Sequence, residues 1–516
     1  MTTRFQNCGR PSRFEWVMMA LLLLAVMAFR LARMDGPLDD PSWRQVWCAY
    51  QAQQIFRESP PDWLCVKINY MGRRDVSVWN FPLYEDLVGA AYKVAGRESL
   101  PMARTITLLF WCGSAFYLFA ATRLFAGTRA AAYATTAYMI LPLSLFYSRA
   151  IHYDVAVLFF CHAMLFHGLR RLAGGSLGHL AAVLAAACLA MLIKPPYAFY
   201  FGLPLLVWGW LHRPRWTTPF RVIGFFILPL ACGWSFDRFR LHLDRDAVLG
   251  PLYPFVYSKE SARNFFFGSL ALRLNPQLWH GLLGSVVRYV TTPIGLLMCI
   301  PAVLPPHGES RTAWLMTWSW VAGTACYVLL VFPMVTSPHD YYLLPLVAPA
   351  SVLVGVGLSR IAAWLEANAG WWGRAIVALL LLLFTWKSED AIVRGPYFRL
   401  DHQFIAAGNV IRTQTRPDDL IVITAYGRTI GNTDPRQLYW ADRRGWAIRP
   451  GELDEKTLAL YRGAGARYAA VIQQPEADGG FDIPALHGLA VRRFPLRDPD
   501  GRNIGDVLLV SLVSSN

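Results

Sequence analysis

Long apolar stretches separated by short polar segments fill the first three quarters of the chain. A helix needs about 20 predominantly apolar residues to cross a bilayer core, so this pattern predicts a polytopic α-helical membrane protein with about eleven spans. The spans are predicted near residues 14 to 33, 105 to 125, 130 to 147, 153 to 169, 178 to 194, 197 to 211, 221 to 236, 284 to 304, 312 to 332, 341 to 360 and 373 to 387. No small-x-small cleavage site follows the first stretch, which is therefore interpreted as an uncleaved helix.

Arginines indicate which side of the membrane each polar segment occupies. With the N-terminus in the cytoplasm, every inner segment carries at least one arginine, as in "RLFAGTR" and "HRPRWTTPFR", which fits the positive-inside rule. The outer side then receives residues 34 to 104, residues 237 to 283, three short turns and everything after residue 388. The two long outer segments are expected to contain helices lying along the membrane surface, such as "WRQVWCAYQAQQIF".

The composition changes abruptly after Lys387. A polar helix candidate, "FRLDHQFIAAGNVIRTQ", is followed by the β-type runs "DLIVITAY", "RYAAVIQ" and "GDVLLVSLV" with turn-forming residues between them. We therefore predict a transmembrane module over residues 1 to 388 and a small extracytoplasmic α/β domain over residues 389 to 516.

Bulk composition supports a membrane protein and argues against a nucleic-acid-binding one. The 516 residues are 55% hydrophobic and only 16% charged, and the formal net charge is +15. The arginines are scattered among short segments and form no single basic face, so membrane lipids are the expected partners of this charge. Cys48 and Cys65 both fall in the first outer segment, where they could form a disulfide if that side is oxidising; their spacing does not decide this.

Several polar residues stand at the edges of predicted spans, where burying them is costly. They are Asp39 and Asp40 after the first span, His152 and Asp154 at the start of the fourth, Lys194 at the end of the fifth, and His339 and Asp340 at the start of the tenth. The predicted topology puts all of them on the outer face.

Each of these residues also has a purely structural interpretation. Asp154 and Asp340 stand where an acid favours a helix N-terminus. Lys194 could be a lysine whose ammonium reaches the membrane surface, His339 a structural interface histidine, and Tyr342 part of an aromatic belt.

Taken together, the residues suit group transfer at a lipid boundary. A carboxylate can accept the proton of an acceptor hydroxyl, and a cation can stabilise a departing phosphate. Lys194 is the only lysine between Lys93 and Lys259. Arginines bind phosphate oxygens through paired hydrogen bonds, and the outer side offers Arg44, Arg73, Arg74 and Arg149.

The chain resembles the bacterial branch of the GT-C glycosyltransferases that includes protein O-mannosyltransferases and lipid A aminoarabinose transferases, a glycosyltransferase family 39-like group. The resemblance covers nearly the whole chain. It is carried by the order and spacing of "LDDPSWRQVWCAYQAQQIF", "WNFPLYEDLVGAAYKVAGRESLPMARTITLLF", "SRAIHYDVAVLFF", "LIKPPYAF", "HDYYLLPLVAPASVLVGVGL" and, near the C-terminus, "LYWADRRGWAI" and "GARYAAVI".

The resemblance implies a membrane enzyme that takes a sugar from a polyprenyl-phosphate donor and passes it, usually with inversion, to an acceptor on the outer face of the cytoplasmic (inner) membrane of a bacterium. Asp39, six residues before Gln45, matches the first-loop catalytic acid, and Asp40 is its alternative. Asp154 matches the second acidic position. Lys194 matches a basic residue near the donor phosphate, and Arg44 and Arg149 are further candidates for that role.

The late outer turn of the family corresponds here to His339, Asp340 and Tyr342. Relatives often carry a Glu before the Pro of the "FPLY" region that helps hold a divalent ion, whereas this chain has the neutral Asn80. Metal use therefore stays open, with Asp39, Asp154 and His339 as the ligands if a metal is bound.

Two other classes of protein remain as alternatives. A transporter or flippase of lipid-linked glycans would also need outer-face charges, although it should carry polar residues through the middle of several spans, and few are found there. A non-catalytic scaffold for envelope assembly, acting through its outer domain, would need no aligned acid, lysine and histidine. The sugar, the envelope acceptor (lipid, glycan or protein) and the oligomeric state are not encoded in any motif of the sequence.

Overall fold

The computed structural model of the chain describes residues 10–39, 42–61, 63, 80–212, 216–243, 259–305, 311–427, 434–475 and 483–513. Contacts between residues divide the chain into two units. The first comprises residues 1–36, 100–238 and 263–397, and the second comprises residues 37–99, 239–262 and 398–516.

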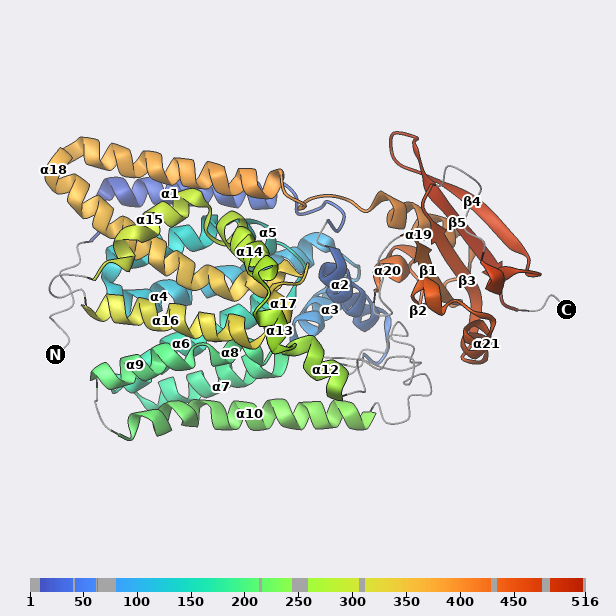
Figure 1. The fold of residues 1–516 in the computed structure, drawn as a ribbon, viewed down its shortest axis with the longest axis horizontal. Helices are drawn as coiled ribbons and strands as arrows, with labels where there is room; N and C mark the ends of the chain where they lie inside the picture. Colours follow the sequence, from blue (N-terminus) through green and yellow to red (C-terminus); the bar gives the residue numbers. More distant parts are fainter. Residues whose placement is uncertain are drawn as a thin grey trace. The chain divides into compact units, whose positions relative to one another are not determined.

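The first unit is helical. Its elements are α1 (Arg13–Leu31), α4 (Leu100–Ile140), α5 (Pro142–Tyr147), α6 (Tyr153–Leu172), α7 (Leu177–Ile193), α8 (Pro196–Phe199), α9 (Gly202–His212), α10 (Thr218–Leu243), α13 (Leu270–Arg273), α14 (Pro276–Ser285), the π-helical turn η2 (Val286–Thr291), α15 (Pro293–Val303), α16 (Arg311–Leu330), α17 (Phe332–Val335), the 3-10 turn η3 (Asp340–Leu343) and α18 (Leu344–Val393). The last residues of α10 and the first of α12 (Lys259–Phe266) fall in the second unit. Figure 1 shows the long helices α4, α6, α16 and α18 packed side by side along one direction.

Two very long helices each contain a glycine kink. Gly127 interrupts α4 with φ 83°, and Gly370 interrupts α18 with φ 53°. Glycine tolerates these positive φ values because it has no Cβ. Both glycines lie where the sequence predicted a boundary between two spans.

The described residues include six helices that are long and apolar enough to cross a membrane, or seven if the bent pair α14/η2 and α15 counts as one span. The protein is therefore a multipass membrane protein, while the total of eleven spans stays a prediction. The predicted span near residues 197 to 211 differs from the structure, which divides it into α8 and the 11-residue α9. At 1.5 Å per residue, α9 covers only about half of a bilayer core.

One end of α1 is fixed by a cluster of charges. Ser12 and Glu15 form a capping box that satisfies backbone N–H groups at the helix start. Glu15 also lies 2.8 Å from Arg129 of α4, and Arg129 lies 2.9 Å from Glu366 of α18. These ion pairs join three helices that are distant in the sequence.

Buried arginines fix the chain around the C-terminal end of α1. Arg30 donates hydrogen bonds to the hydroxyl of Ser148 and to the carbonyl of Met139, both at 2.5 Å. Arg104 of α4 donates to the carbonyls of Met34 and Gly36, at 2.8 and 2.6 Å. Because an arginine at membrane depth needs such acceptors, these contacts set where the first span ends.

The second unit combines the first predicted outer segment with the C-terminal domain. Its described helices are α2 (Ser42–Arg57), α3 (Leu83–Ala95), α19 (His402–Gln414), α20 (Arg436–Ala441), the 3-10 turn η4 (Pro450–Glu452), α21 (Glu455–Gly463) and the 3-10 turn η5 (Pro484–Leu486). The predicted helices "WRQVWCAYQAQQIF" and "FRLDHQFIAAGNVIRTQ" correspond to α2 and α19.

A five-stranded sheet forms the core of the C-terminal domain. The strands β1 (Leu420–Tyr426), β2 (Gly445–Ala447), β3 (Ala466–Gln473), β4 (Val491–Arg497) and β5 (Asn503–Ser511) are ordered β2-β1-β3-β5-β4. β1 pairs in parallel with β2 and β3, whereas β5 runs antiparallel to β3 and β4. The sequence predicted β1, β3 and β5 but not β2, which is only three residues long, or β4, whose residues are largely exposed.

Helix α2 is held against the C-terminal domain by polar contacts. Arg57 pairs with Asp442 at 2.5 Å, and Arg444 donates to the side chain of Gln54 at 2.8 Å. The hydroxyl of Tyr50 donates to the carbonyl of Arg443 at 2.9 Å. All three contacts meet the "DRR" turn after α20, so residues 37–99 and the C-terminal domain form one unit.

Candidate active site

A buried ion pair lies at the centre of the polar residues in the first unit. The ammonium of Lys194 is 2.7 Å from Oδ2 of Asp154, and both side chains are buried. The hydroxyl of Tyr197 accepts a hydrogen bond from Lys194 at 3.1 Å and lies 2.9 Å from the same carboxylate oxygen. The structure therefore brings together two of the residues that the sequence singled out.

The local backbone explains how the pair is positioned. His152 is the N-cap of α6, and its Nδ1 accepts the backbone N–H of Asp154, which places the acid in the first turn of the helix. Lys194 ends α7 with φ −154° and is followed by two prolines, which cannot continue the helix. Tyr197 then lies in the short helix α8, directed back at Asp154.

Four tyrosine rings surround the ammonium of Lys194. Its nitrogen is 4.0 Å from the ring centroid of Tyr342, 4.4 Å from Tyr197, 4.9 Å from Tyr341 and 5.8 Å from Tyr153. Aromatic faces attract a cation at these distances. The rings therefore stabilise a charge that burial alone would disfavour.

One oxygen of Asp154 has no partner in the part of the chain that the structure describes. Oδ2 is occupied by Lys194 and Tyr197, but Oδ1 is buried and makes no hydrogen bond. A buried carboxylate oxygen without a donor is rare in folded proteins. Such an atom is available to accept a hydrogen bond from a substrate hydroxyl.

Asp340 has a different environment. Its Oδ1 accepts a hydrogen bond from Tyr147 at 2.5 Å, and its Oδ2 accepts one from Tyr397, beyond the end of α18. Burial, followed by the negative charge of Asp340, raises the pKa of Tyr397 well above its usual value, so this phenol keeps the proton that it donates. Both oxygens of Asp340 are thus satisfied within the fold.

The other predicted residues of the first unit lie close to aromatic side chains. His339 is half-buried, and its ring centroid is 5.5 Å from that of Tyr341, which also contacts the ring of His152 at 4.9 Å. Arg149 is buried, and its guanidinium donates to the carbonyl of Arg33 at 3.2 Å. Tyr342 belongs to the ring cage of Lys194, which goes beyond the aromatic-belt interpretation.

In the second unit, Asp39 is held by Gln45, which belongs to the same sequence motif. The amide of Gln45 donates to the backbone carbonyl of Asp39 at 2.7 Å and lies 3.4 Å from its Oδ1. Arg44 packs its guanidinium over Trp43 at 4.4 Å and over Trp47 at 5.1 Å. Asp39 and Asp154 belong to different units, so their meeting in one site stays a prediction.

Several other predictions concern this first outer segment. Asn80 is buried, and its Nδ2 has no hydrogen-bond partner in the parts of the chain described above. Asp40, Cys65, Arg73 and Arg74 lie outside the described residues, so the disulfide between Cys48 and Cys65 and the roles of these arginines stay predictions.

The described side chains do not fit a metal site. No group of three His, Cys, Asp or Glu residues is close enough to hold a metal ion, within the residues that the structure describes. Oδ2 of Asp154 already pairs with the ammonium of Lys194 at 2.7 Å, and this ammonium would compete with a metal ion for that oxygen. We therefore route no chemical step through a metal.

The sequence missed most of the cage around Lys194. Tyr153 and Tyr197 are neighbours of the predicted residues in the chain, and Tyr341 precedes Tyr342, but only the folded chain brings α6, α8 and η3 together. The signal that could have found them was the tyrosine beside each predicted charged residue: "YD", "KPPY" and "DYY".

Comparisons with known proteins are informative at the level of structure. No family model matches the sequence, and no curated protein matches it. The fold is similar to aminoarabinose transferase ArnT from Cupriavidus metallidurans bound to undecaprenyl phosphate, with a TM-score of 0.55 and 15% identity over 98% of this chain and 99% of that chain.

Two further structures extend this likeness. The oligosaccharyltransferase of Archaeoglobus fulgidus, in complex with zinc and sulfate, matches with a TM-score of 0.53 and 12% identity over 95% of this chain and 72% of that chain. Arabinofuranosyltransferase AftD from Mycobacteria matches with a TM-score of 0.58 and 14% identity over 99% of this chain and 40% of that chain. All three are GT-C fold glycosyltransferases, so the GT-C architecture expected from the sequence is confirmed, whereas the count of eleven spans stays a prediction.

Proposed function

We propose that the protein is a membrane glycosyltransferase that moves a sugar from a polyprenyl-phosphate donor to an envelope acceptor. The observation that carries this proposal is the buried Asp154, with one oxygen on Lys194 and the other open, in a fold shared with a transferase bound to undecaprenyl phosphate. A carboxylate that offers a hydrogen-bond acceptor beside a cation suits a site where a hydroxyl attacks and a phosphate departs.

The reaction is proposed to invert the anomeric carbon in one displacement. The acceptor oxygen forms a bond to that carbon while the bond from the carbon to the phosphate oxygen breaks. The acceptor proton passes to the carboxylate of Asp39, and the polyprenyl phosphate leaves with the bonding electron pair. Asp39 is suited to this role because Gln45 fixes its position through the backbone carbonyl.

Asp154 and Lys194 are proposed to position the two reacting groups. The open Oδ1 of Asp154 would accept a hydrogen bond from the acceptor hydroxyl and orient it for attack. The ammonium of Lys194, held between Asp154 and the tyrosine rings, would stabilise negative charge on the departing phosphate. Arg149 and Arg44 are the further phosphate-binding candidates, and both guanidinium groups are already placed by packing or backbone contacts.

The proposed setting is a bacterial inner membrane, with the N-terminus in the cytoplasm and the C-terminal domain outside. Single cysteines at two exposed positions test this orientation, Arg123 in α4 and Lys456 in α21, in a variant whose nine native cysteines are replaced. An impermeant maleimide should label position 456 in intact cells and position 123 only after permeabilisation. The reverse pattern would refute the orientation.

The decisive experiment replaces the proposed base. Membranes containing Asp39→Asn are supplied with a labelled polyprenyl-phosphate sugar, and transfer of the label is measured at equal protein level. Loss of a general base lowers the rate by roughly 100-fold to 10,000-fold. Asp35→Asn is the matched control, because Asp35 is an exposed acid four residues earlier in the chain. Transfer at the normal rate by Asp39→Asn would remove Asp39 from the role of base.

A comparison of envelope lipids, glycans and proteins by mass spectrometry identifies the acceptor. Cells with the wild-type chain should contain a glycosylated product that is absent both without the chain and with Asp39→Asn. A flippase or a scaffold predicts no such dependence on one carboxylate. A product that persists with Asp39→Asn would favour those alternatives.

A further inference from the structure

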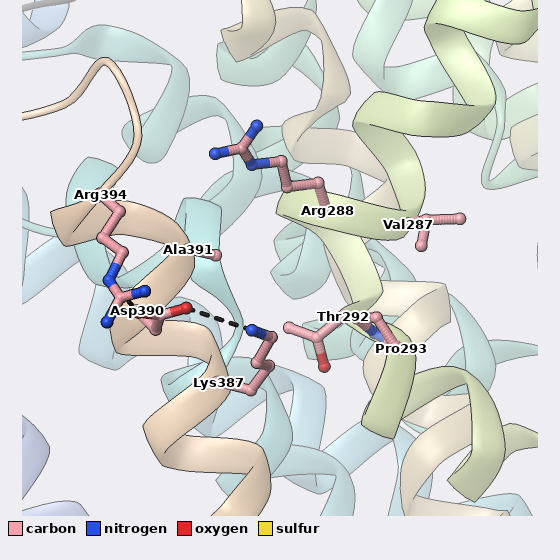
Figure 2. Close-up of a pocket in the computed structure, with 8 residues that line it drawn as sticks. All are labelled: Val287, Arg288, Thr292, Pro293, Lys387, Asp390, Ala391 and Arg394. Atoms are coloured by element: carbon pink, nitrogen blue, oxygen red, sulfur yellow. Dashed lines mark hydrogen bonds and ion pairs between the residues drawn. The ribbon is translucent and has the colours of Figure 1, made fainter.

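A cavity with charged residues in its lining lies in the first unit, apart from the residues discussed so far. It has a volume of about 290 Å³ and is lined by Val287, Arg288, Thr292, Pro293, Lys387, Asp390, Ala391 and Arg394. Figure 2 shows Arg288 on the wall formed by η2, and Lys387, Asp390 and Arg394 on the wall formed by the end of α18. The cavity shares no residue with the Asp154–Lys194 pair.

The cavity lies at a break in a span, because Thr292 and Pro293 at the break belong to its lining. The pair α14/η2 and α15 bends by 90°, and Thr292 at the bend adopts φ 62°, a conformation that non-glycine residues rarely adopt. Its hydroxyl caps the new helix by accepting the N–H of Gly295 at 3.1 Å. Gly295 also lets α15 approach α18, since an added Cβ there would lie 3.0 Å from the ring of Phe384.

Positive charge exceeds negative charge around this cavity. Asp390 is the only acid in the lining, and it already pairs with Lys387 at 3.1 Å and with Arg394 at 2.7 Å. The side chain of Asp390 is 14% exposed, whereas those of Lys387 and Arg394 are 38% and 77% exposed, so the cations are the more accessible groups. Arg288 is exposed and has no acidic partner among the residues described in the structure. Two of the three positive charges are thus uncompensated.

Helices α15 and α18, which both contribute to the lining of the cavity, also carry exposed apolar side chains. On α15 they are Leu297 and Ile300, and on α18 they are Leu379, Leu382 and Trp386. Large apolar groups exposed on a membrane protein face lipid chains. An exposed tryptophan next to basic residues is typical of the depth where headgroups begin.

We propose that this cavity, the elbow pocket, binds the phosphodiester headgroup of an anionic glycerophospholipid. The phosphate would be held by Arg288 from η2 and by Lys387 from α18, with the acyl chains along the exposed leucines of α15 and α18. Arginine and lysine are the usual ligands of phosphate oxygens. A cavity of about 290 Å³ is at the lower end of small-ligand sites and fits a headgroup rather than a whole lipid.

The surroundings of the pocket favour a lipid headgroup over free phosphate as the ligand. Free phosphate would need only the cations, whereas the apolar faces on both sides add affinity only for a ligand that carries chains. The proposal does not depend on the transferase reaction, because a bound lipid would support the bent span whatever the protein catalyses.

Native mass spectrometry of the purified full-length chain tests the proposal. The chain is released from detergent in the presence of phosphatidylglycerol or phosphatidylcholine, and the bound fraction is measured. We expect a clear preference for phosphatidylglycerol. Because losing one charged hydrogen bond to phosphate weakens binding by roughly tenfold, Arg288→Ala with Lys387→Ala should reduce the affinity by at least that factor. Arg123→Ala, which removes an exposed arginine of α4, is the matched control and should bind normally.

A further variant and competing ligands distinguish a phospholipid site from a free-phosphate site and from a donor site. Arg288→Lys keeps the charge but loses the planar donor pair, so it should fold normally and bind with intermediate affinity. Equal binding of phosphatidylcholine, or normal binding by the double variant, would overturn the proposal. So would displacement by excess inorganic phosphate alone, which would indicate a free-phosphate site, or a preference for polyprenyl phosphate, which would indicate a donor site.

Discussion

Asp154, which is buried, and Asp340, which is half-buried, are two acids at the starts of helical segments in the same unit, and their hydrogen-bond partners differ. Both oxygens of Asp340 accept hydrogen bonds from tyrosines, Tyr147 and Tyr397. Asp154 shares one oxygen between Lys194 and Tyr197 and leaves the other without a donor among the described residues. In the sequence, both acids stand where an acid favours a helix N-terminus, and only the family resemblance assigned Asp154 to the second acidic position.

We propose that this difference separates a structural acid, Asp340, from a functional one, Asp154. An acid with every lone pair satisfied contributes to stability and has little left to offer a substrate. A buried acid with an unbonded oxygen lowers the stability of the fold, because that oxygen has lost its hydrogen bonds to water and accepts none from the protein. On this basis Asp340 fixes the end of α18, and Asp154 is the better candidate for contact with substrate.

Of the substitutions at these two acids, Asp154→Asn should have the larger effect on activity. The amide keeps the shape of the side chain but not its charge, so it orients a hydroxyl poorly and no longer balances Lys194. We expect the transfer rate per folded protein to fall by roughly 100-fold, because the acceptor hydroxyl is no longer held in position. The labelled-sugar assay in membranes measures this effect. If Asp340→Asn lowers the rate per folded protein as much, the distinction between the two acids is wrong.

Lys194→Met should have the largest effect on stability. It leaves the carboxylate of Asp154 buried without its cation, and breaking a buried ion pair in this way costs about 3–5 kcal/mol. Thermal unfolding in detergent measures the change. The double variant Lys194→Met with Asp154→Asn removes both charges, so it should recover most of the stability and none of the activity. Exposed Lys456→Met is the control and should unfold as the wild type does.

Local patterns predicted much of the fold. Alternating apolar residues bounded by turn residues located β1, β3 and β5, and the span boundaries near Gly127 and Gly370 coincide with real kinks. The six-residue spacing from Asp39 to Gln45 also matches a contact in the structure. These features depend on residues close together in the chain, where backbone preference and periodicity act directly.

Contacts between segments that are distant in the chain could not be predicted from the sequence. Tyr397 donates to Asp340 across 57 residues, and Lys194 meets Asp154 across 40 residues. Whether a buried acid is satisfied depends on such partners, which no spacing rule encodes. The same applies to Arg44, a predicted phosphate ligand whose guanidinium packs over two tryptophan rings. The sequence could therefore propose the residues and their roles but not the partners that each of them contacts.

Asp340→Leu tests the structural half of the comparison. It removes the acceptor of two tyrosine hydroxyls, and each buried hydroxyl left without a partner costs about 1–3 kcal/mol. The midpoint of thermal unfolding in detergent should fall clearly, while the transfer rate per folded molecule stays near that of the wild type. Unchanged stability would show that the tyrosines find other acceptors and that Asp340 does not fix the end of α18.

Tyr397→Phe should have the smallest effect, and the pH dependence of that effect is informative. Removing one hydroxyl leaves Oδ2 of Asp340 without this donor, which costs about 1–2 kcal/mol. Tyr117→Phe is the control, since the hydroxyl of Tyr117 makes no hydrogen bond within the described residues. Because the pKa of Tyr397 is raised in the folded state, its contribution is complete at neutral pH.

The contribution of Tyr397 should be lost only as the pH rises above about 10, where the unfolded phenol ionises while the folded one does not. The stability difference between wild type and Tyr397→Phe should therefore be constant from neutral to mildly alkaline pH and shrink beyond it. Unfolding midpoints measured across this range provide the test. If the stability difference shrinks on acidification instead, the titrating group is Asp340 and not Tyr397. The hydrogen bonds to Asp340 would then be lost when its carboxylate is protonated, which would contradict its role as the structural acid in the comparison with Asp154.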